Sequence, residues 1–332
     1  MSCCIAWSVS GYLGRLLGKM QTRSVDLFKA ILLKVASALL FAVMQALVRS
    51  LGEIIPLGQV VFFRSAFAIV PLVVVYAWRN ELITAVYTTR PFGQLWRGLI
   101  SVFGMFLNFA ALARLPLVDA TAISFAAPLI TVAFAAIFLR ERVRIYRWSA
   151  VGVGFLGVLV TLWPHLEPAH LMTAGGTAAT IGATCAMASA FTSAGSVIQT
   201  RRLTDTESTS SIVFYFSLIC ALAGLATWPF GWVTPSVGQL AALVALGVLG
   251  GLAHILLTES YRYAPASVIA PFDYTTMVWA FVLGYALFGE VPTKYVFIGA
   301  TIIAGAGLFV IWRERQLGLR RIREAEGPPT AS

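Results

Sequence analysis

The sequence is short of charge. Asp, Glu, Lys and Arg make up 11% of the 332 residues, whereas 59% are hydrophobic and the mean hydropathy is +0.84. A soluble domain carries about 25% charged residues, so this composition excludes a soluble globular protein and indicates a polytopic membrane protein. The net charge of +10 does not indicate a nucleic-acid partner, because the basic residues lie in short connections between apolar runs, where they orient the chain in the bilayer.

Cysteine is scarce as well. The four cysteines have neither disulfide nor zinc spacing, and no strand pattern precedes the glycines, so the sequence predicts no metal site, no phosphate-binding loop and no cofactor. Many glycines lie in two apolar runs, where small residues permit close helix contact. We expect packing seams or the face of a homodimer at Gly152, Gly154, Gly157, Gly299, Gly305 and Gly307.

Long apolar runs occupy most of the chain. A bilayer span needs about 20 mostly apolar residues, and ten stretches meet this requirement, which predicts an all-α protein with ten transmembrane helices and a lipid bilayer around them. The predicted helices are 29–50, 57–78, 95–113, 117–139, 147–163, 174–199, 210–231, 238–261, 267–288 and 293–312.

The chain also contains an internal repeat. The stretch Pro116–Glu141 recurs as Pro265–Glu290, with an offset of 265 − 116 = 149 residues, which indicates a duplicated membrane unit. Five helices per unit is an odd number, so the second unit must enter the membrane upside down, as in transporters built from inverted repeats. The expected segments are a basic N-terminal tail (1–27), repeat 1 (28–163), a linker (164–173), repeat 2 (174–313) and a basic C-terminal tail (314–332).

The basic residues predict the orientation. With the N-terminus inside, only Arg49, Arg114 and Lys294 of the 24 Lys and Arg residues lie in outer segments, while Lys34 and Arg64 lie within helices. Because cytoplasmic loops carry the excess of basic residues, we expect both termini in the cytoplasm and the protein in the inner membrane.

Several motifs resemble those of a known family. They are an arginine early in the second helix (Phe62-Phe63-Arg64), the run Ser124-Phe125-Ala126-Ala127-Pro128, Glu141, Gly289-Glu290 and a glycine-rich last helix. From about residue 28 to 315 the chain resembles the ten-helix EamA family of the drug/metabolite transporter superfamily. The resemblance implies a secondary carrier that moves small organic molecules through a cavity between its halves, without ATP.

Two groups within that family look similar. Arg90-Pro91-Phe92 and Arg97-Gly98-Leu99 resemble S-adenosylmethionine uptake carriers, whereas Val278-Trp279 and Leu283-Gly284-Tyr285 resemble riboflavin transporters. Asp273 stands where the first group has a basic residue, so the local charge is inverted.

Two charged residues lie well inside predicted helices, where a charge costs roughly 2.5–3.5 kcal/mol on insertion scales and usually faces a partner or a wet cavity. Arg64 either holds a substrate carboxylate or phosphate, or pairs with Asp119. Asp273, just past a proline that should kink its helix, either carries a proton for transport or pairs with Arg97. Lys34 is expected to reach the cytoplasmic headgroups.

Further polar and aromatic residues are candidates for a substrate site. Glu259 either contacts substrate or pairs with Arg262, and His254 either contacts substrate or is a hydrogen-bonded interior histidine. The remaining candidates each have an ordinary packing role as the alternative, and they are Gln45, Asn108, Ser124, Phe125, Tyr274 and Trp279.

These features predict a secondary active transporter that works by alternating access. The mixture of charges and aromatic rings suits S-adenosylmethionine, riboflavin or an amino-acid-like compound, carried with a coupling proton or in exchange for another metabolite. The alternative is an intramembrane enzyme that uses His254, Glu259 and Asp273, but their spacing is not that of a helical metal pair.

Overall fold

The computed structural model describes residues 2–325, apart from 53, 81, 139–143, 167–173, 205 and 264–268. Throughout these residues the chain is helical and contains no strand. The elements are α1 (Ser2–Leu51), α2 (Leu57–Trp78), α3 (Leu82–Val86), α4 (Pro91–Leu112), α5 (Leu117–Ser124), α6 (Ala126–Phe138), α7 (Ile145–Leu166), α9 (Ala174–Leu203), α10 (Thr209–Leu225), the 3₁₀ turn η1 (Trp228–Phe230), α11 (Val237–Tyr263), the 3₁₀ turn η2 (Ala270–Tyr274), α13 (Thr275–Phe288) and α14 (Lys294–Ala325).

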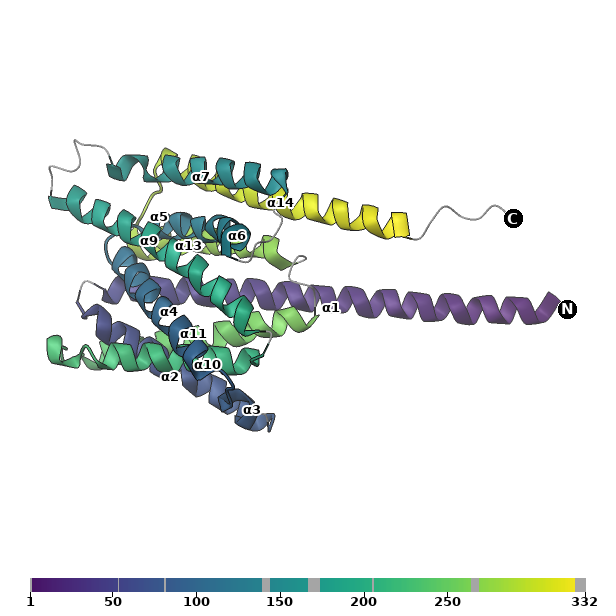
Figure 1. Cartoon of the computed structure of the whole chain (residues 1–332), viewed down its shortest axis with the longest axis horizontal. Coiled ribbons are helices and arrows are strands. Elements are labelled where there is room, and N and C mark those ends of the chain that lie inside the picture. Colours follow the sequence, from purple (N-terminus) through teal and green to yellow (C-terminus); the bar gives the residue numbers. More distant parts are fainter. Residues whose placement is uncertain are drawn as a thin grey trace.

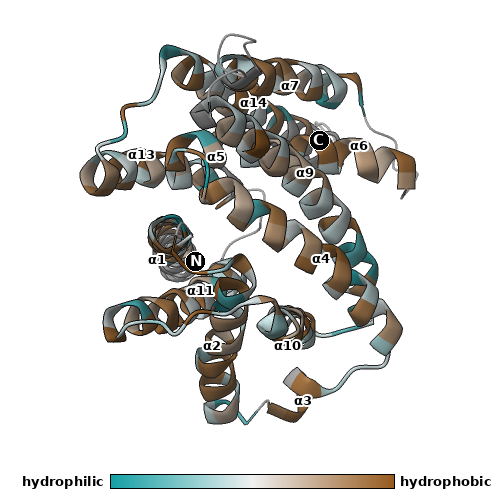
Figure 2. Ribbon diagram, turned by 90° about the vertical axis from the view of Figure 1, so that its left-hand side faces the viewer, coloured by the Kyte–Doolittle hydropathy of each residue, from teal (hydrophilic) through white to brown (hydrophobic). Residues whose placement is uncertain are grey.

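The helices confirm the predicted polytopic class. In the described part of the chain, eight are long and apolar enough to cross a membrane, and two shorter apolar stretches, Ser210–Leu225 and Phe272–Phe288, accompany them. Each of the ten predicted stretches lies on one of these segments. Figure 2 shows hydrophobic residues on the outward faces of the bundle, as expected for a surface that meets lipid.

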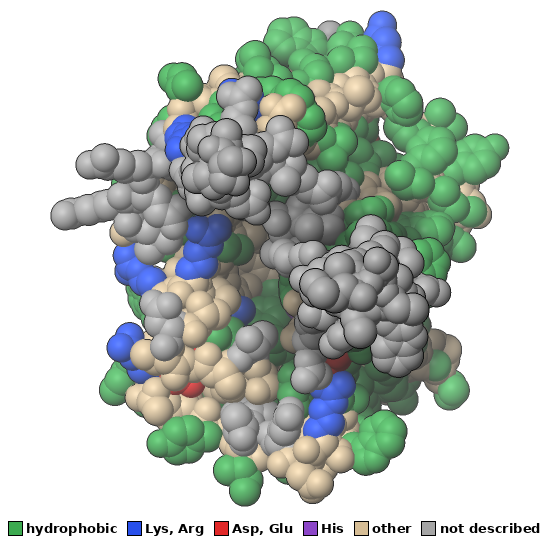
Figure 3. Space-filling view, turned by 90° about the vertical axis from the view of Figure 1, so that its right-hand side faces the viewer, with side chains coloured by type: hydrophobic (Ala, Val, Ile, Leu, Met, Phe, Trp, Pro, Cys, Tyr) green, Lys and Arg blue, Asp and Glu red, His purple; other side chains and the backbone are tan. Residues whose placement is uncertain are grey.

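Both ends of the chain lie at the same end of the bundle. In Figure 1 the long α1 begins at that end and α14 runs towards it. α4 and α11 run across the bundle in opposite directions to each other. We call this end the terminal end and the opposite one the far end. Figure 3 looks at the terminal end and shows Lys and Arg side chains gathered on it, with few Asp or Glu.

The helices form two groups that each draw on both halves of the chain. In one group α1 packs on α11, α11 on α2 and α2 on α10. In the other, α9 packs on α6, α7 on α14 and α5 on α13, while α4 lies between the groups and contacts both α9 and α10. Figure 2 shows the groups one above the other with α4 alongside.

Two of the predicted helices are interrupted. The stretch 117–139 breaks at Phe125 into α5 and α6, because Pro128 has no N–H to donate to the carbonyl of Ser124 and its ring crowds that carbonyl. The predicted kink near Pro271 is confirmed, since the 3₁₀ turn η2 precedes α13 there. The two breaks face each other, because the rings of Phe125 and Tyr274 stack with centroids 5.0 Å apart.

An arginine of α1 closes the far end. Arg49 forms an ion pair with Glu290 at 2.5 Å and also donates to the carbonyls of Leu112 and Leu115. The other carboxylate oxygen of Glu290 accepts the backbone N–H of Leu117 at 2.7 Å. The ends of α1, α4, α5 and α13 are therefore joined through one charged pair. Glu141, the predicted counterpart of Glu290, lies outside the described residues.

The predicted glycine seam joins α7 to α14. A Cβ at Gly299 would lie 2.1 Å from Thr161 Oγ1 and 2.5 Å from the carbonyl oxygen of Gly157, so only glycine lets the two backbones approach this closely. Gly305, one and a half turns further along α14, has open space around its Cα.

We expect Gly299→Val to destabilise the protein by about 1–3 kcal/mol, because the added atoms overfill the seam. Gly305→Val is the matched control, since no atom lies within 4 Å of the added Cβ. Thermal unfolding in detergent measures both. Equal midpoints for the two variants would show that the seam does not hold α7 against α14.

Glu207 joins two helix ends at the terminal end. One carboxylate oxygen accepts the backbone N–H groups of Thr89 (2.8 Å) and Arg90 (2.9 Å), and the other accepts the hydroxyl of Ser211 and the amide of Gln94. Burial of the carboxylate raises its pKa, but the hydrogen bonds from Thr89, Thr88 and Arg90 outweigh this effect and lower the pKa to about 2.

A lowered pKa means that ionised Glu207 stabilises the folded state above the ordinary glutamate pKa of 4.5, and that this stabilisation is lost as the pH falls towards 2. Glu207→Gln should therefore lower the midpoint of thermal unfolding at pH 7, and the difference from the wild type should shrink between pH 4.5 and pH 3. A difference that stays constant over this range would contradict the assignment.

Candidate functional site

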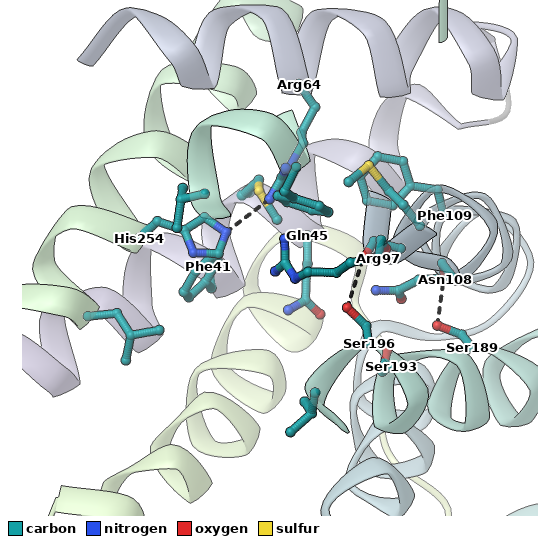
Figure 4. Close-up of a pocket in the computed structure, with 18 of the residues that line it drawn as sticks. Phe41, Gln45, Arg64, Arg97, Asn108, Phe109, Ser189, Ser193, Ser196 and His254 are labelled. Atoms are coloured by element: carbon teal, nitrogen blue, oxygen red, sulfur yellow. Dashed lines mark hydrogen bonds between the residues drawn. The ribbon is translucent and has the colours of Figure 1, made fainter. Parts of the chain in front are cut away.

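A cavity lies between the two helix groups. It has a volume of about 730 Å³, within the range of small-molecule sites. Its walls come from α1, α2, α10 and α11 on one side and from α4 and α9 on the other (Figure 4). The lining residues are Phe41, Met44, Gln45, Arg64, Arg97, Ser101, Gly104, Met105, Asn108, Phe109, Ser189, Ser193, Ser196, Val197, Val213, Phe216, His254, Leu257, Thr258 and Tyr261.

Arg64 is the most deeply buried charge in the cavity, with 5% of its surface exposed. Its Nη2 lies 3.2 Å from Nε2 of His254. Because a guanidinium can only donate, His254 accepts through Nε2, and its proton is then on Nδ1. Nε and Nη1 of Arg64 are buried without a hydrogen-bond partner among the described residues.

Arg97 enters the cavity from α4. Its Nε donates to the hydroxyl of Thr200 at 2.7 Å and its Nη1 to the carbonyl of Ile212 at 3.0 Å, which hold the side chain between α9 and α10. The guanidinium carbons of Arg64 and Arg97 each lie 5.4 Å from the ring centroid of Phe216. The ring of Phe216 therefore makes cation–π contacts with both guanidinium groups.

The α9 wall of the cavity is lined with hydroxyl groups. Ser189, Ser193 and Ser196 follow each other at helical spacing on α9, so they share one face. Ser189 donates to the carbonyl of Gly104 at 3.0 Å, and Ser196 hydrogen-bonds to Ser101 at 2.7 Å. The lining contains two arginines, hydroxyls and amides, but no Asp or Glu among the described residues.

The cavity brings together four of the predicted substrate-site residues. Gln45, Arg64, Asn108 and His254 come from four different helices and line the same space. Arg97, which we predicted as a structural partner of Asp273, lines it as well. The sequence analysis missed Phe216 and the three serines of α9. For the serines the signal in the sequence was their helical spacing at 189, 193 and 196.

Asp273 lies elsewhere, and its predicted pairing with Arg97 is wrong. Its carboxylate forms an ion pair with Lys34 at 2.5 Å, and half of its side-chain surface is exposed. Lys34 does not extend to the headgroups as expected, because its side chain is only 4% exposed and pairs with Asp273. α1 continues beyond this lysine towards the terminal end, which places the lysine inside the bundle.

Two other expected ion pairs differ from the observed contacts. The hydrogen bond of Arg64 goes to His254 rather than to Asp119, which is buried in the first turn of α5. Glu259 pairs with Arg79 of α2 at 2.7 Å, whereas the side chain of its expected partner, Arg262, lies outside the described residues.

The three residues of the enzyme alternative do not meet in one site. His254 contacts Arg64, Glu259 contacts Arg79 and Asp273 contacts Lys34, so each side chain has a different partner. Among the described residues, no three His, Cys, Asp or Glu side chains are close enough together to hold a metal ion.

The remaining candidates surround the helix breaks and do not line the cavity. Ser124 donates to the carbonyl of Thr121, and the ring of Phe125 stacks on that of Tyr274. The indole N–H of Trp279 is buried without a hydrogen-bond partner in the described part of the chain. These are contacts that the packing alternative predicts for Ser124, Phe125 and Tyr274.

The pairing of Asp273 predicts the effect of removing its charge. Asp273→Asn leaves the buried ammonium group of Lys34 without its counterion, so we expect a loss of about 1–3 kcal/mol in stability. The double variant Lys34→Met with Asp273→Asn should recover most of it, and thermal unfolding measures both. A single variant that is as stable as the wild type but inactive in transport would assign Asp273 to transport instead.

Sequence comparisons identify relatives that are named transporters. The chain is 33% identical to an S-adenosylmethionine uptake transporter of Rickettsia bellii (strain RML369-C) over 269 residues, which cover 80% of this chain and 87% of the relative. It is 28% identical to a pseudopaline exporter of Pseudomonas aeruginosa (85% of this chain, 96% of the relative). A riboflavin transporter of Rhizobium johnstonii is 29% identical (70% and 74%).

The fold also matches a solved structure. A protein of known crystal structure superposes with a TM-score of 0.58 at 20% identity, covering 86% of this chain and 95% of the other, which supports the fold alone. Residues 28–163 and 180–313 match the EamA-like transporter family. The polytopic helical fold and this match over most of the chain agree, and the protein belongs to the EamA-like transporter family of the drug/metabolite transporter superfamily.

Proposed function

We propose that this transporter is a secondary carrier that moves a small organic metabolite across the membrane by alternating access. The observation that carries the proposal is the cavity between two helix groups, each built from both halves of the chain. A relative movement of the groups would open such a cavity to one side of the membrane and then to the other. The relatives, an uptake transporter, an exporter and a riboflavin transporter, support a transport function.

The cavity supports the inverted repeat. Half of its lining residues form pairs that are 149 positions apart, for example 193 − 44 = 149, which is the offset of the repeated stretches. Equivalent positions of two units therefore face the same space. The pairs are Met44 with Ser193, Arg64 with Val213, Met105 with His254, Asn108 with Leu257 and Phe109 with Thr258.

Helix packing supports the same relation. α1 packs on α11 and α13, and its counterpart α9 packs on α4 and α6, which are the counterparts of α11 and α13. Two further contacts join a helix to its own counterpart: α2 with α10 and α7 with α14. Phe125 and Tyr274, whose rings stack, are also 149 positions apart. We infer ten spanning helices in two inverted units.

The cavity extends towards the terminal end. Arg97, Val213 and Tyr261 lie close to the ends of their helices on that side, whereas fully buried leucines of the Arg49 network, such as Leu112 and Leu115, close the far end. The gathering of basic residues at the terminal end favours the cytoplasm for that side. We propose a cytoplasm-facing state of an inner-membrane carrier, with both termini inside.

Side-specific labelling tests alternating access. In a variant without native cysteines, Ser193→Cys should react with a membrane-impermeant maleimide from the terminal side. Adding Arg49→Gln, which removes the ion pair to Glu290, should raise the reaction rate from the far side. Leu203→Cys, next to the terminal end of α9, is the control that should not respond to Arg49→Gln. Labelling of Ser193→Cys that is equal from both sides in every variant would refute a cavity with alternating access.

The inverted topology has a direct test. Reporter fusions at residues 115 and 264 should give opposite compartment signals, periplasmic for the first and cytoplasmic for the second. Fusions at residues 88 and 207, both near the Glu207 contacts at the terminal end, should agree with each other. The same signal at 115 and 264 would contradict the inverted repeat.

A further inference from the structure

We infer that the cavity selects ligands that carry a carboxylate, and that this group is bound between Arg64 and Arg97. The inference rests on the proposed function, because it treats the cavity as the substrate site. It narrows the substrate class to amino-acid-like compounds and excludes neutral flavins.

The first argument is the state of Arg64. Its guanidinium is buried, and Nε and Nη1 have no hydrogen-bond partner among the described residues. Two buried donors on a cation are costly to leave unsatisfied. Its one hydrogen bond within the described part of the chain goes to the neutral His254, which orients the guanidinium but does not neutralise it. An oxyanion in the cavity would satisfy both the charge and the free donors.

The second argument is the position of Arg97. Its guanidinium carbon lies as close to Phe216 as that of Arg64 does, 5.4 Å from the same ring. Figure 4 shows both guanidinium groups directed into the same part of the cavity. One ligand can therefore contact both cations at once.

The third argument is where the acidic residues are. Asp273 pairs with Lys34, Glu259 with Arg79 and Glu290 with Arg49, and the described lining contains no carboxylate of its own. In the described part of the chain, Lys34, Arg49 and Arg79 thus each have a carboxylate partner, whereas Arg64 and Arg97 share the cavity without one. Because buried like charges repel each other, the pair requires a counterion, which the ligand supplies.

The remaining surface of the cavity suits the rest of an amino-acid-like ligand. Phe41, Phe109 and Tyr261 offer ring faces, on which a flat heterocycle can stack or an ammonium or sulfonium group can lie. The hydroxyls of Ser193 and Ser196 can accept hydrogen bonds from an amino group. His254 is a positioning residue, held at its other side by an edge-to-face contact with Phe41 at 5.0 Å.

A change in the ligand tests the inference without changing the protein. We would measure the binding of S-adenosylmethionine and of its decarboxylated analogue to the purified wild type by calorimetry, with methionine and methioninamide as a second pair. Loss of the carboxylate should weaken binding about 10- to 100-fold, as expected for charge-assisted hydrogen bonds. Equal affinity within each pair, or binding of none of the carboxylates, would overturn the inference.

Variants locate the carboxylate. Arg64→Gln and Arg97→Gln should each weaken binding of S-adenosylmethionine about 10- to 100-fold and leave the affinity for the decarboxylated analogue little changed. Arg114→Gln removes an exposed arginine outside the cavity and should bind like the wild type. His254→Gln keeps an acceptor for Arg64 and should retain the preference for the carboxylate, whereas His254→Leu should reduce it. Equal losses for both ligands in the arginine variants would contradict carboxylate recognition.

Transport measurements separate this inference from the proposed function. Labelled S-adenosylmethionine could bind in a carboxylate-dependent way and yet not be taken up into liposomes. That result would refute the carrier function and leave the binding site in place. Riboflavin could instead be transported at the same rate as carboxylate ligands, with no effect of Arg64→Gln or Arg97→Gln. That result would support the carrier function and refute carboxylate selection. Stronger binding of flavin mononucleotide than of S-adenosylmethionine would identify the anion as a phosphate and overturn the assignment to a carboxylate.

Discussion

The high cost of an uncompensated charge in lipid decides how the helices of this protein are joined. α1 carries Lys34 and Arg49, and each pairs with a carboxylate at one end of the η2–α13 segment, Asp273 and Glu290. A helix of the first half is thereby attached at two levels to a helix of the second half. Neither member of a pair can leave its position without exposing the charge of the other to an apolar surrounding.

These two attachments restrict how the halves can move. Any rearrangement that separates α1 from α13 must break at least one ion pair, whereas a movement that carries both helices together breaks neither. The cavity lies between α4 and α9 on one side and α1, α2, α10 and α11 on the other, so α1 belongs both to this joint and to the cavity wall. The serine hydroxyls of its α9 wall hydrogen-bond to α4, through Ser189 to the carbonyl of Gly104 and through Ser196 to Ser101, so α4 and α9 are held together on that side.

The site differs from the sequence-based interpretation in the partners of its charged residues. A pair between Asp273 and Arg97 was one of two alternatives for the aspartate, but Asp273 pairs with Lys34 and Arg97 lines the cavity together with Arg64. Helical depth can be read from a sequence to within about a turn, but the direction of a side chain depends on which neighbour its helix meets. For Arg97 that neighbour is α10, whose Ile212 carbonyl holds the guanidinium.

The sequence by itself determined the membrane class, the positions of the ten apolar stretches and the kink at Pro271, because each follows from local composition and backbone chemistry. It also placed Gln45, Arg64, Asn108 and His254 on a list of polar residues inside apolar runs, where a partner or a cavity is required. Only the tertiary structure decided that these four and Arg97 share one cavity while Asp273 and Glu259 do not. The reason is that ion pairing depends on distances between helices far apart in the chain, and composition and spacing carry no record of those distances.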